Sequence, residues 1–182
     1  MPSNHGKNWE SAPLHELTQY IVSAHHQRLK SELRRLNQCL NQAITGHGDR
    51  DGAMIPQLPG IFGELWEELE AHMQREELIL FPTIERDEAA AARGRALPRV
   101  PFGSIRNPIR LMGMEHESAE KELLSMRRAA CDYCLPEQAG PAFRDLFEGL
   151  REMEDHLHTH LHLENGILFP RAIALEVAQP RG

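Results

Sequence analysis

The most constraining feature of this sequence is a motif that occurs twice. H-x-x-x-E-x-x-I-L-F-P is found at residues 72–82 and again at residues 160–170. Histidine and glutamate four positions apart lie one turn apart on the same helical face, so one metal ion can accept both side chains. A single copy is weak evidence. Two copies, each followed at the same offset by Ile-Leu-Phe-Pro, are hard to explain as an ordinary core and indicate two matching halves of a metal-binding fold.

The duplication extends to the segment before each motif. His26 and Glu32 precede a leucine in the first half, and His116 and Glu122 precede a leucine in the second, with a similar interval to the next motif. The sequence therefore predicts a doubled helical hairpin. A pseudo-two-fold bundle built in this way brings four imidazoles and two carboxylates to one central point. The predicted metal ligands are His26, His72, Glu76, His116, His160 and Glu164.

Apolar residues at helical spacing predict four long helices. Their ranges are about 13–44, 58–85, 105–130 and 141–177. Ser11 is a suitable N-cap, and Pro13 falls in the first turn that follows it. Only 5% of the residues are aromatic and helix formers dominate, which also favours helix over sheet.

The segments between these helices are predicted loops. Glycine and proline are dense in residues 45–59 and 94–104, and the helical pattern is broken over residues 131–140. The fold class expected is an all-α, antiparallel up-down-up-down four-helix bundle. The predicted domain boundaries are an N-terminal lead-in over residues 1–12, the bundle over 13–178 and a C-terminal tail over 179–182.

The ligand set favours iron. Four imidazoles and two carboxylates suit two adjacent iron ions bridged by the carboxylates, and the chain has 11 histidines, far more than usual. Zinc or manganese can occupy the same ligands, because affinity order alone does not select iron. A bundle with histidine-rich faces and no metal is disfavoured by the double motif.

Composition excludes several other classes of protein. A net charge of -7 and a pI near 5.9 provide no basic surface for nucleic acid. No apolar run approaches the roughly 20 residues needed to cross a membrane, and the N-terminus is polar. Three cysteines do not form the framework of a secreted disulfide protein. We expect a cytoplasmic protein with reduced thiols, and leave open whether it forms a homodimer.

With these residues in place, the sequence resembles the hemerythrin-like proteins, and more narrowly the repair-of-iron-centres family of di-iron iron-sulfur cluster repair proteins. The shared features begin at Trp9, pass through Tyr20 and His26, and include both copies of the motif and the segment around His116. The resemblance implies the same six ligands, with Glu76 and Glu164 as bridging carboxylates. It also implies two non-haem iron ions per chain with an oxo or hydroxo bridge.

The resemblance also implies a function. Members of the repair family act in the nitrosative and oxidative stress response, supplying iron to damaged iron-sulfur clusters, and they can bind nitric oxide. Iron-sulfur proteins are then the expected recipients, and nitric oxide or oxygen the expected small ligand. The alternative is a di-iron module that senses or stores oxygen or nitric oxide. Turnover, for example nitric oxide reduction, does not follow from ligands alone.

Two departures from the family patterns are informative. Oxygen-carrying hemerythrins have a further histidine one turn after the third-helix ligand, where this chain has Glu120, and a longer spacing to aspartate in the fourth helix. Reversible oxygen carriage is therefore disfavoured. Repair proteins commonly have an N-terminal domain with a cysteine pair, and only about ten residues precede the matching region here. We expect that domain to be missing.

Several other residues leave alternatives open. Neighbours on a helix point about 100° apart, so only one of His25 and His26 faces the centre, and His26 is favoured. His47 lies in the first loop and either approaches the centre or is solvated. His156 shares the face of His160 and can support a ligand or shuttle protons.

The remaining candidates are weaker. His158 and His162 are expected at the surface. Glu115 either lines a route to the metal or is a solvated helix residue. Cys131 and Cys134 have the spacing of a redox pair, but no second pair and no βαβ pattern accompany them.

Overall fold

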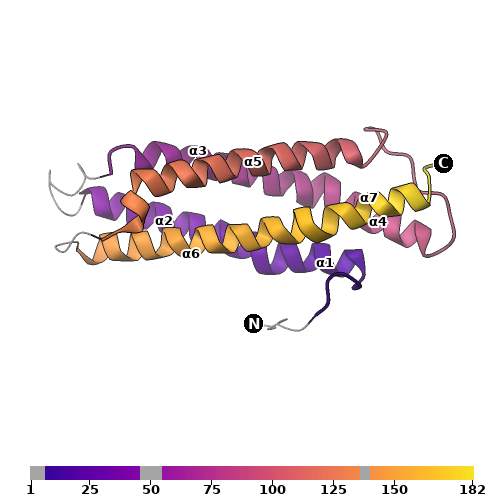
Figure 1. Ribbon diagram of the computed structural model, residues 1–182, viewed down its shortest axis with the longest axis horizontal. Helices are drawn as coiled ribbons and strands as arrows, with labels where there is room; N and C mark the ends of the chain where they lie inside the picture. Colours follow the sequence, from indigo (N-terminus) through magenta and orange to yellow (C-terminus); the bar gives the residue numbers. More distant parts are fainter. Residues whose placement is uncertain (1–6, 46–54, 136–139) are drawn as a thin grey trace.

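The computed structural model describes residues 7–45, 55–135 and 140–182. The chain runs through four long helices, which lie side by side with alternating direction (Figure 1). The first comprises α1 (Leu14–Tyr20), η1 (Ile21–His26) and α2 (Gln27–Thr45), and the second comprises α3 (Leu58–Arg75), η4 (Glu76–Leu80) and α4 (Phe81–Ala91). The third is α5 (Arg106–Ala129), followed by the 3-10 turn η5 (Cys131–Tyr133), and the fourth comprises α6 (Pro141–Leu163), η6 (Glu164–Leu168) and α7 (Phe169–Ala178).

The helices pack as two antiparallel pairs. In Figure 1, α3 lies beside α5, and α2 lies beside α6, and these are the two most extensive helix contacts. Each pair joins one helix from the first half of the chain to one from the second half, so the two halves pack against each other. The predicted all-α, antiparallel up-down-up-down bundle is confirmed.

The second helix is longer than predicted. It passes Pro82 and ends at Ala91, six residues beyond the expected end at 85. Alanine favours helix, and two acidic residues of this extension are held by other parts of the chain. Glu88 accepts hydrogen bonds from the backbone N–H groups of Leu14 and His15, and Asp87 forms a buried ion pair with Arg181. These contacts involve residues far apart in sequence, so the local pattern did not indicate them.

Three short π-helical segments interrupt the helices at the duplicated positions. The segment η1 ends at His26, while η4 begins at Glu76 and η6 begins at Glu164. In the two motif copies, Pro82 and Pro170 follow the segments and lack the N–H group that would bond to the preceding turn. A wider π turn accommodates this missing donor, and such turns are frequent at functional sites.

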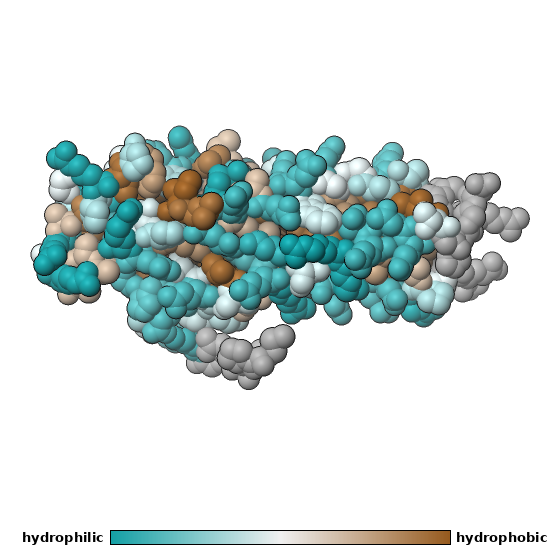
Figure 2. All heavy atoms as spheres, turned by 180° about the vertical axis from the view of Figure 1, so that it is seen from behind, coloured by the Kyte–Doolittle hydropathy of each residue, from teal (hydrophilic) through white to brown (hydrophobic). Residues whose placement is uncertain are grey.

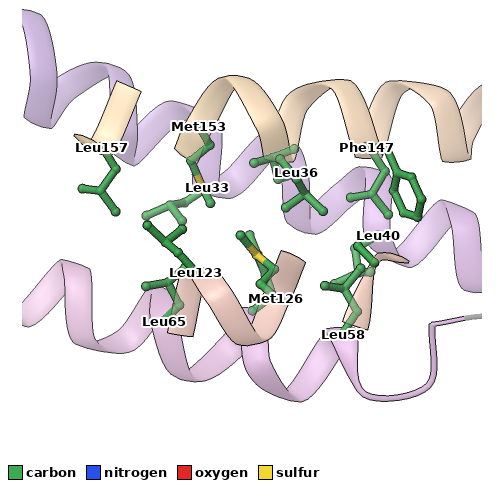
Figure 3. Packing of buried hydrophobic residues seen from close by; sticks show 14 of the residues in the cluster. Leu33, Leu36, Leu40, Leu58, Leu65, Leu123, Met126, Phe147, Met153 and Leu157 are labelled. Atoms are coloured by element: carbon green, nitrogen blue, oxygen red, sulfur yellow. The ribbon is translucent and has the colours of Figure 1, made fainter. Parts of the chain in front are cut away.

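The buried side chains form two hydrophobic clusters separated along the bundle axis. The larger cluster is built from leucines, methionines and phenylalanines of α2, α3, α5 and α6, which interdigitate between the helices (Figure 3). The smaller cluster joins α1, α4, α7 and the start of α5. Along each helix the motif residues lie between these clusters, so a polar layer crosses the middle of the bundle.

The surface is mainly polar. Figure 2 shows one face that is mostly hydrophilic, with hydrophobic residues gathered toward one end of the bundle. Leu78 and Met114 are the most exposed large hydrophobic side chains near the polar layer, at 67% and 62%. Among the helices of the described ranges, none combines the length and apolar character needed to cross a membrane.

Candidate metal centre

Six side chains converge in the polar layer. All are buried, with residue exposures between 0% and 3%. Each offers one ligand atom, and these atoms form two overlapping groups in which all lie within 4.8 Å of one another. One group is His26, Glu76, His160 and Glu164, and the other is His72, Glu76, His116 and Glu164. The structure thus brings together all six residues predicted from the sequence, and their role as ligands stays a prediction.

The histidines are arranged as two pairs. The Nε2 atoms of His26 and His160 are 3.2 Å apart, and those of His72 and His116 are 3.1 Å apart. Each pair therefore points its Nε2 atoms at one position. The two groups share both glutamates, so the arrangement defines two adjacent positions that we call the His26–His160 position and the His72–His116 position.

The glutamates lie between the two positions. Oε1 of Glu164 is 2.8 Å from Nε2 of His160, while its Oε2 is 3.2 Å from Nε2 of His116. Oε2 of Glu76 is 3.3 Å from Nε2 of His26 and 3.4 Å from Nε2 of His72. Each carboxylate therefore faces one histidine or more from each pair, which is the placement that a bridging ligand requires.

The donor set fits a cation. Both glutamates are fully buried, and neither oxygen of Glu76 nor Oε2 of Glu164 has a hydrogen-bond partner among the described residues. Burying an ionised carboxylate without a partner is costly, and proteins normally pair such groups with cations or metal ions. Imidazole nitrogens and carboxylate oxygens are suitable ligands for iron, manganese and zinc. These six residues therefore fit a pair of metal ions.

The electrostatics of these six side chains support the same conclusion. Burial opposes a charge on His26, yet the neighbouring carboxylates of Glu164 and Glu76 raise its pKa to about 10. Burial also opposes a charge on Glu164, but His160, His116 and His26 hold the pKa of its carboxyl well below the usual range. Without a metal ion, the carboxylates thus draw a proton onto an imidazole, and a metal ion and that proton compete for the site.

Three of the four histidines are oriented by a hydrogen bond from Nδ1, the ring nitrogen that faces away from the centre. The Nδ1–H group of His26 donates to Glu77 at 2.8 Å, and that of His72 donates to Glu115 at 2.9 Å. The Nδ1–H group of His116 donates to the Oδ1 atom of Asn165 at 3.0 Å. Because these oxygens only accept, Nδ1 carries a proton, and in the neutral imidazole the lone pair of Nε2 then faces the centre.

The carboxylates in these outer contacts are themselves held by cations. Lys30 donates to Glu77 at 2.7 Å, and Arg75 contacts Glu115 at 2.7 Å. Burial raises the pKa of both carboxyls, but the hydrogen bonds from Lys30 and His26 to Glu77, and from His72 and Arg75 to Glu115, lower it overall. Glu115 was predicted only as a residue near the route to the metal, and here it fixes a predicted ligand.

Sequence reasoning missed Glu77 and Asn165. A signal was present, since both directly follow the glutamate of a motif copy and so occupy equivalent positions of the repeat. Their contact with a histidine of a neighbouring helix depends on bundle packing. That packing is not visible in the spacing within one helix.

A stack of imidazoles lies beside the His26–His160 position. The ring of His25 stacks on that of His156, with centroids 4.8 Å apart and an interplanar angle of 7°, and lies 5.5 Å from the ring of His160. Burial lowers the pKa of His25 to about 3 and that of His156 to about 4, helped by the other imidazoles and Arg28. Of the adjacent pair, His26 belongs to the ligand group, and His25 is buried behind it.

The other predicted residues lie away from the centre. His158 and His162 are exposed, as predicted, and so are Cys131 and Cys134, which are free thiols. The prediction for His47 lies outside the described residues. A part for His156 in proton transfer stays a prediction.

The fold and this polar layer agree with a comparison to protein families. The family model described as Hemerythrin HHE cation binding domain matches residues 18–172. The chain therefore belongs to the hemerythrin family, and the matched range contains all six convergent residues.

Curated relatives narrow this assignment. The chain is 32% identical over 171 residues to the iron-sulfur cluster repair protein YtfE of Cronobacter sakazakii, a match that covers 93% of this chain and 71% of the relative. It is 32% identical to a probable iron-sulfur cluster repair protein of Haemophilus influenzae, over 93% of this chain and 70% of the relative. It is 33% identical to the iron-sulfur cluster repair protein YtfE of Escherichia coli O81, over 93% of this chain and 71% of the relative. Within the hemerythrin family, the chain groups with the iron-sulfur cluster repair proteins.

Proposed function

We propose that this protein binds two iron ions between its helices and supplies iron for the repair of damaged iron-sulfur clusters under nitrosative and oxidative stress. The observation that carries the proposal is the pair of overlapping ligand groups that share two fully buried carboxylates, Glu76 and Glu164. The names of the relatives support the repair function, and the family description supports cation binding. The bundle proposed to hold the iron spans residues 13–178, with 1–12 and 179–182 as flanking segments.

The ligand types suit a protein that must give up its metal. Histidine and glutamate side chains exchange one at a time, and imidazole must be neutral to bind. Protonation of His26, favoured by Glu164 and Glu76, therefore competes directly with metal binding. A pair of iron ions held by these six residues would supply two adjacent one-electron redox centres able to bind a small ligand such as nitric oxide.

The proposed recipients are iron-sulfur proteins, and we place the activity in the cytoplasm. The thiols Cys39, Cys131 and Cys134 are unpaired in the structure, which suits a reducing compartment.

The first experiment measures metal content and the visible spectrum of anaerobically purified protein, before and after exposure to nitric oxide. The proposal expects about two iron ions per chain, from the two ligand groups, and a spectral change with nitric oxide. Glu76→Ala and Glu164→Ala should each lose iron, because each removes a carboxylate shared by both positions. Iron binding at wild-type levels in both variants would contradict the assignment.

A second experiment tests repair itself. Iron-loaded protein is mixed anaerobically with an iron-sulfur protein whose cluster has been damaged by nitric oxide, and recovery of the cluster absorbance is followed. Recovery should exceed that from an equal amount of free ferrous iron and should be absent with the metal-free protein. Recovery that only matches free iron would leave the centre without a repair role.

One observation favours a second candidate function, a module that senses or stores oxygen or nitric oxide. The six convergent side chains are at most 3% exposed, so a small gas molecule reaches them more readily than a recipient protein does. The two functions differ in the fate of the iron. A sensing or storage module binds nitric oxide reversibly and retains both ions in the presence of a damaged recipient, whereas a repair protein loses iron to it.

A further inference from the structure

The two metal positions share their glutamates but differ in the support given to their histidines. At the His72–His116 position, both histidines donate an Nδ1–H group to a side-chain oxygen, of Glu115 and Asn165 respectively. At the His26–His160 position, only His26 does so, to Glu77. The Nδ1 atom of His160 is buried and has no hydrogen-bond partner among the described residues.

The internal repeat traces this difference to one residue. Glu115 directly precedes His116 and reaches across the bundle to His72. The equivalent residue in the first half directly precedes His26 and is His25. His25 lies beside His160, as Glu115 lies beside His72. The two residues therefore occupy equivalent positions of the pseudo-two-fold arrangement, but one is an imidazole and the other a carboxylate.

The ring of His25 does not replace the missing acceptor. Its plane is inclined by only 22° to that of His160 at a centroid distance of 5.5 Å, so the rings stack. A nitrogen lone pair lies in the plane of its ring and therefore points past a stacked neighbour. Both ring nitrogens of His25 also lack a hydrogen-bond partner among the described residues.

The stack does not provide a third metal site either. The rings of His25 and His156 are nearly parallel, at 7°, so their nitrogens do not converge on one ion. His25 can therefore affect metal binding only at the neighbouring His26–His160 position, through its contact with His160.

We propose that the two positions hold iron unequally, that the ion at the His26–His160 position leaves first, and that His25 is the positioning residue responsible. A hydrogen bond from the outer ring nitrogen fixes the orientation of a ligand histidine and strengthens its inner nitrogen as a donor. Loss of such a partner lowers metal affinity by about 10- to 100-fold. The inference rests on the proposed di-iron function and identifies which iron that function releases.

The test follows iron release from the full chain. Protein loaded anaerobically with ferrous iron is mixed with excess of a coloured ferrous chelator, and absorbance is recorded with time. Wild-type protein should release its iron in two phases of similar amplitude, with rates that differ by about 10- to 100-fold.

Reciprocal substitutions assign the phases. His25→Glu places at position 25 the residue found at the equivalent position 115, and it should slow the fast phase toward the slow one. His25→Gln, which offers an uncharged acceptor, should act in the same direction and serves if the buried carboxylate impairs folding. Glu115→His should accelerate the slow phase and leave the fast phase unchanged. His162→Glu, at an exposed histidine of α6, is the matched control and should leave both phases unchanged.

Single-phase release from wild-type protein would overturn the inference. So would two unchanged phases in both His25 variants when circular dichroism shows them folded. These outcomes are separate from the proposed function. A protein that releases iron in two phases but does not repair a damaged cluster contradicts only the repair function, and one that repairs clusters with single-phase release contradicts only the inequality of the positions.

Discussion

The larger hydrophobic cluster and the polar layer lie next to each other on the same four helices, yet they place opposite demands on the fold. In the cluster, leucines such as Leu33, Leu36 and Leu65 are fully buried against other apolar side chains (Figure 3). In the layer, Glu76 and Glu164 are equally buried, but some of their oxygens have no partner. Burial stabilises the first group and destabilises the second.

This difference indicates a division of labour. The cluster supplies the stability that fixes the helices, and the fixed helices hold buried carboxylates and imidazoles in a geometry that is unfavourable until a cation binds. Substitutions in the cluster should therefore lower stability and leave the metal content intact. Substitutions of the shared glutamates should instead remove the metal, together with the stability that metal binding adds.

Removal of iron should have the largest effect. Ligand at about 100 times its dissociation constant stabilises a folded protein by about 2.7 kcal/mol per site, so two sites contribute about 5 kcal/mol. Urea unfolding of iron-loaded and chelator-treated protein measures this difference. The double variant Glu76→Gln with Glu164→Gln should show no such dependence on iron. Equal stability of iron-loaded and metal-free wild-type protein would contradict the claim that the polar layer is unfavourable until a cation binds.

A cavity in the larger hydrophobic cluster should have the second-largest effect on stability. Leu36→Ala removes a fully buried side chain and should lower the free energy of unfolding by about 3 kcal/mol, within the range of 2–5 kcal/mol usual for such changes. Iron content per folded chain should remain at the wild-type level. Leu124→Ala, at a residue that is 47% exposed on α5, is the control and should change stability by less than about 0.5 kcal/mol. If Leu36→Ala lost iron without losing stability, the cluster would not have the purely stabilising role proposed for it.

The pH dependence of stability should differ between the two metal states. Because the pKa of His26 is raised from 6.5 to about 10, its contribution to the metal-free protein is full below pH 6.5 and lost as pH rises toward 10. Because the pKa of Glu164 is lowered, its contribution is present above pH 4.5 and lost in acid. The unfolding temperature of the metal-free protein should therefore fall as the pH is raised from 6.5 to 9.

The iron-loaded protein should instead lose stability on the acidic side of this range. Neutral imidazoles bind the metal, so acidification below about pH 6.5 should release iron and lower the unfolding temperature. Parallel pH profiles for the loaded and metal-free forms would contradict the competition between metal and proton at His26.

The smallest effect is expected at a carboxylate outside the layer. Burial, together with Glu68 and Glu64, raises the pKa of Glu122 to about 7, so its contribution to stability is full below pH 4.5 and lost as pH rises through 7. Glu122→Gln should therefore be more stable than wild type at pH 8, by less than about 1 kcal/mol because the side chain is only partly buried and its charge is screened by solvent. Urea unfolding at pH 8 with and without iron checks this, with the exposed Glu120→Gln as control. A gain that depends on iron would place Glu122 within the layer.

Much of this arrangement could be predicted from the sequence because it repeats. The spacing of histidine and glutamate within a helix placed His72 with Glu76, and the duplication placed His26 and His116 opposite them. Local periodicity also predicted four helices and their antiparallel order.

What the sequence did not indicate depends on contacts between helices. The partners Glu77 and Asn165 act on histidines of other helices, and the extension of α4 is held by Leu14, His15 and Arg181. Two of the three π segments, η4 and η6, lie directly before a helix whose first turn contains a proline, which removes a donor inside a helix that tertiary packing keeps continuous. His25 was judged only as a competitor of His26, and its stacking on His160 became visible from the packed bundle.

The most direct test of the central claim is anomalous diffraction at the iron absorption edge from crystals of anaerobically loaded protein. The account predicts two iron peaks in the middle of the bundle, one between His26 and His160 and the other between His72 and His116, with Glu76 and Glu164 contacting both. A single peak, or peaks away from these six side chains, would contradict it.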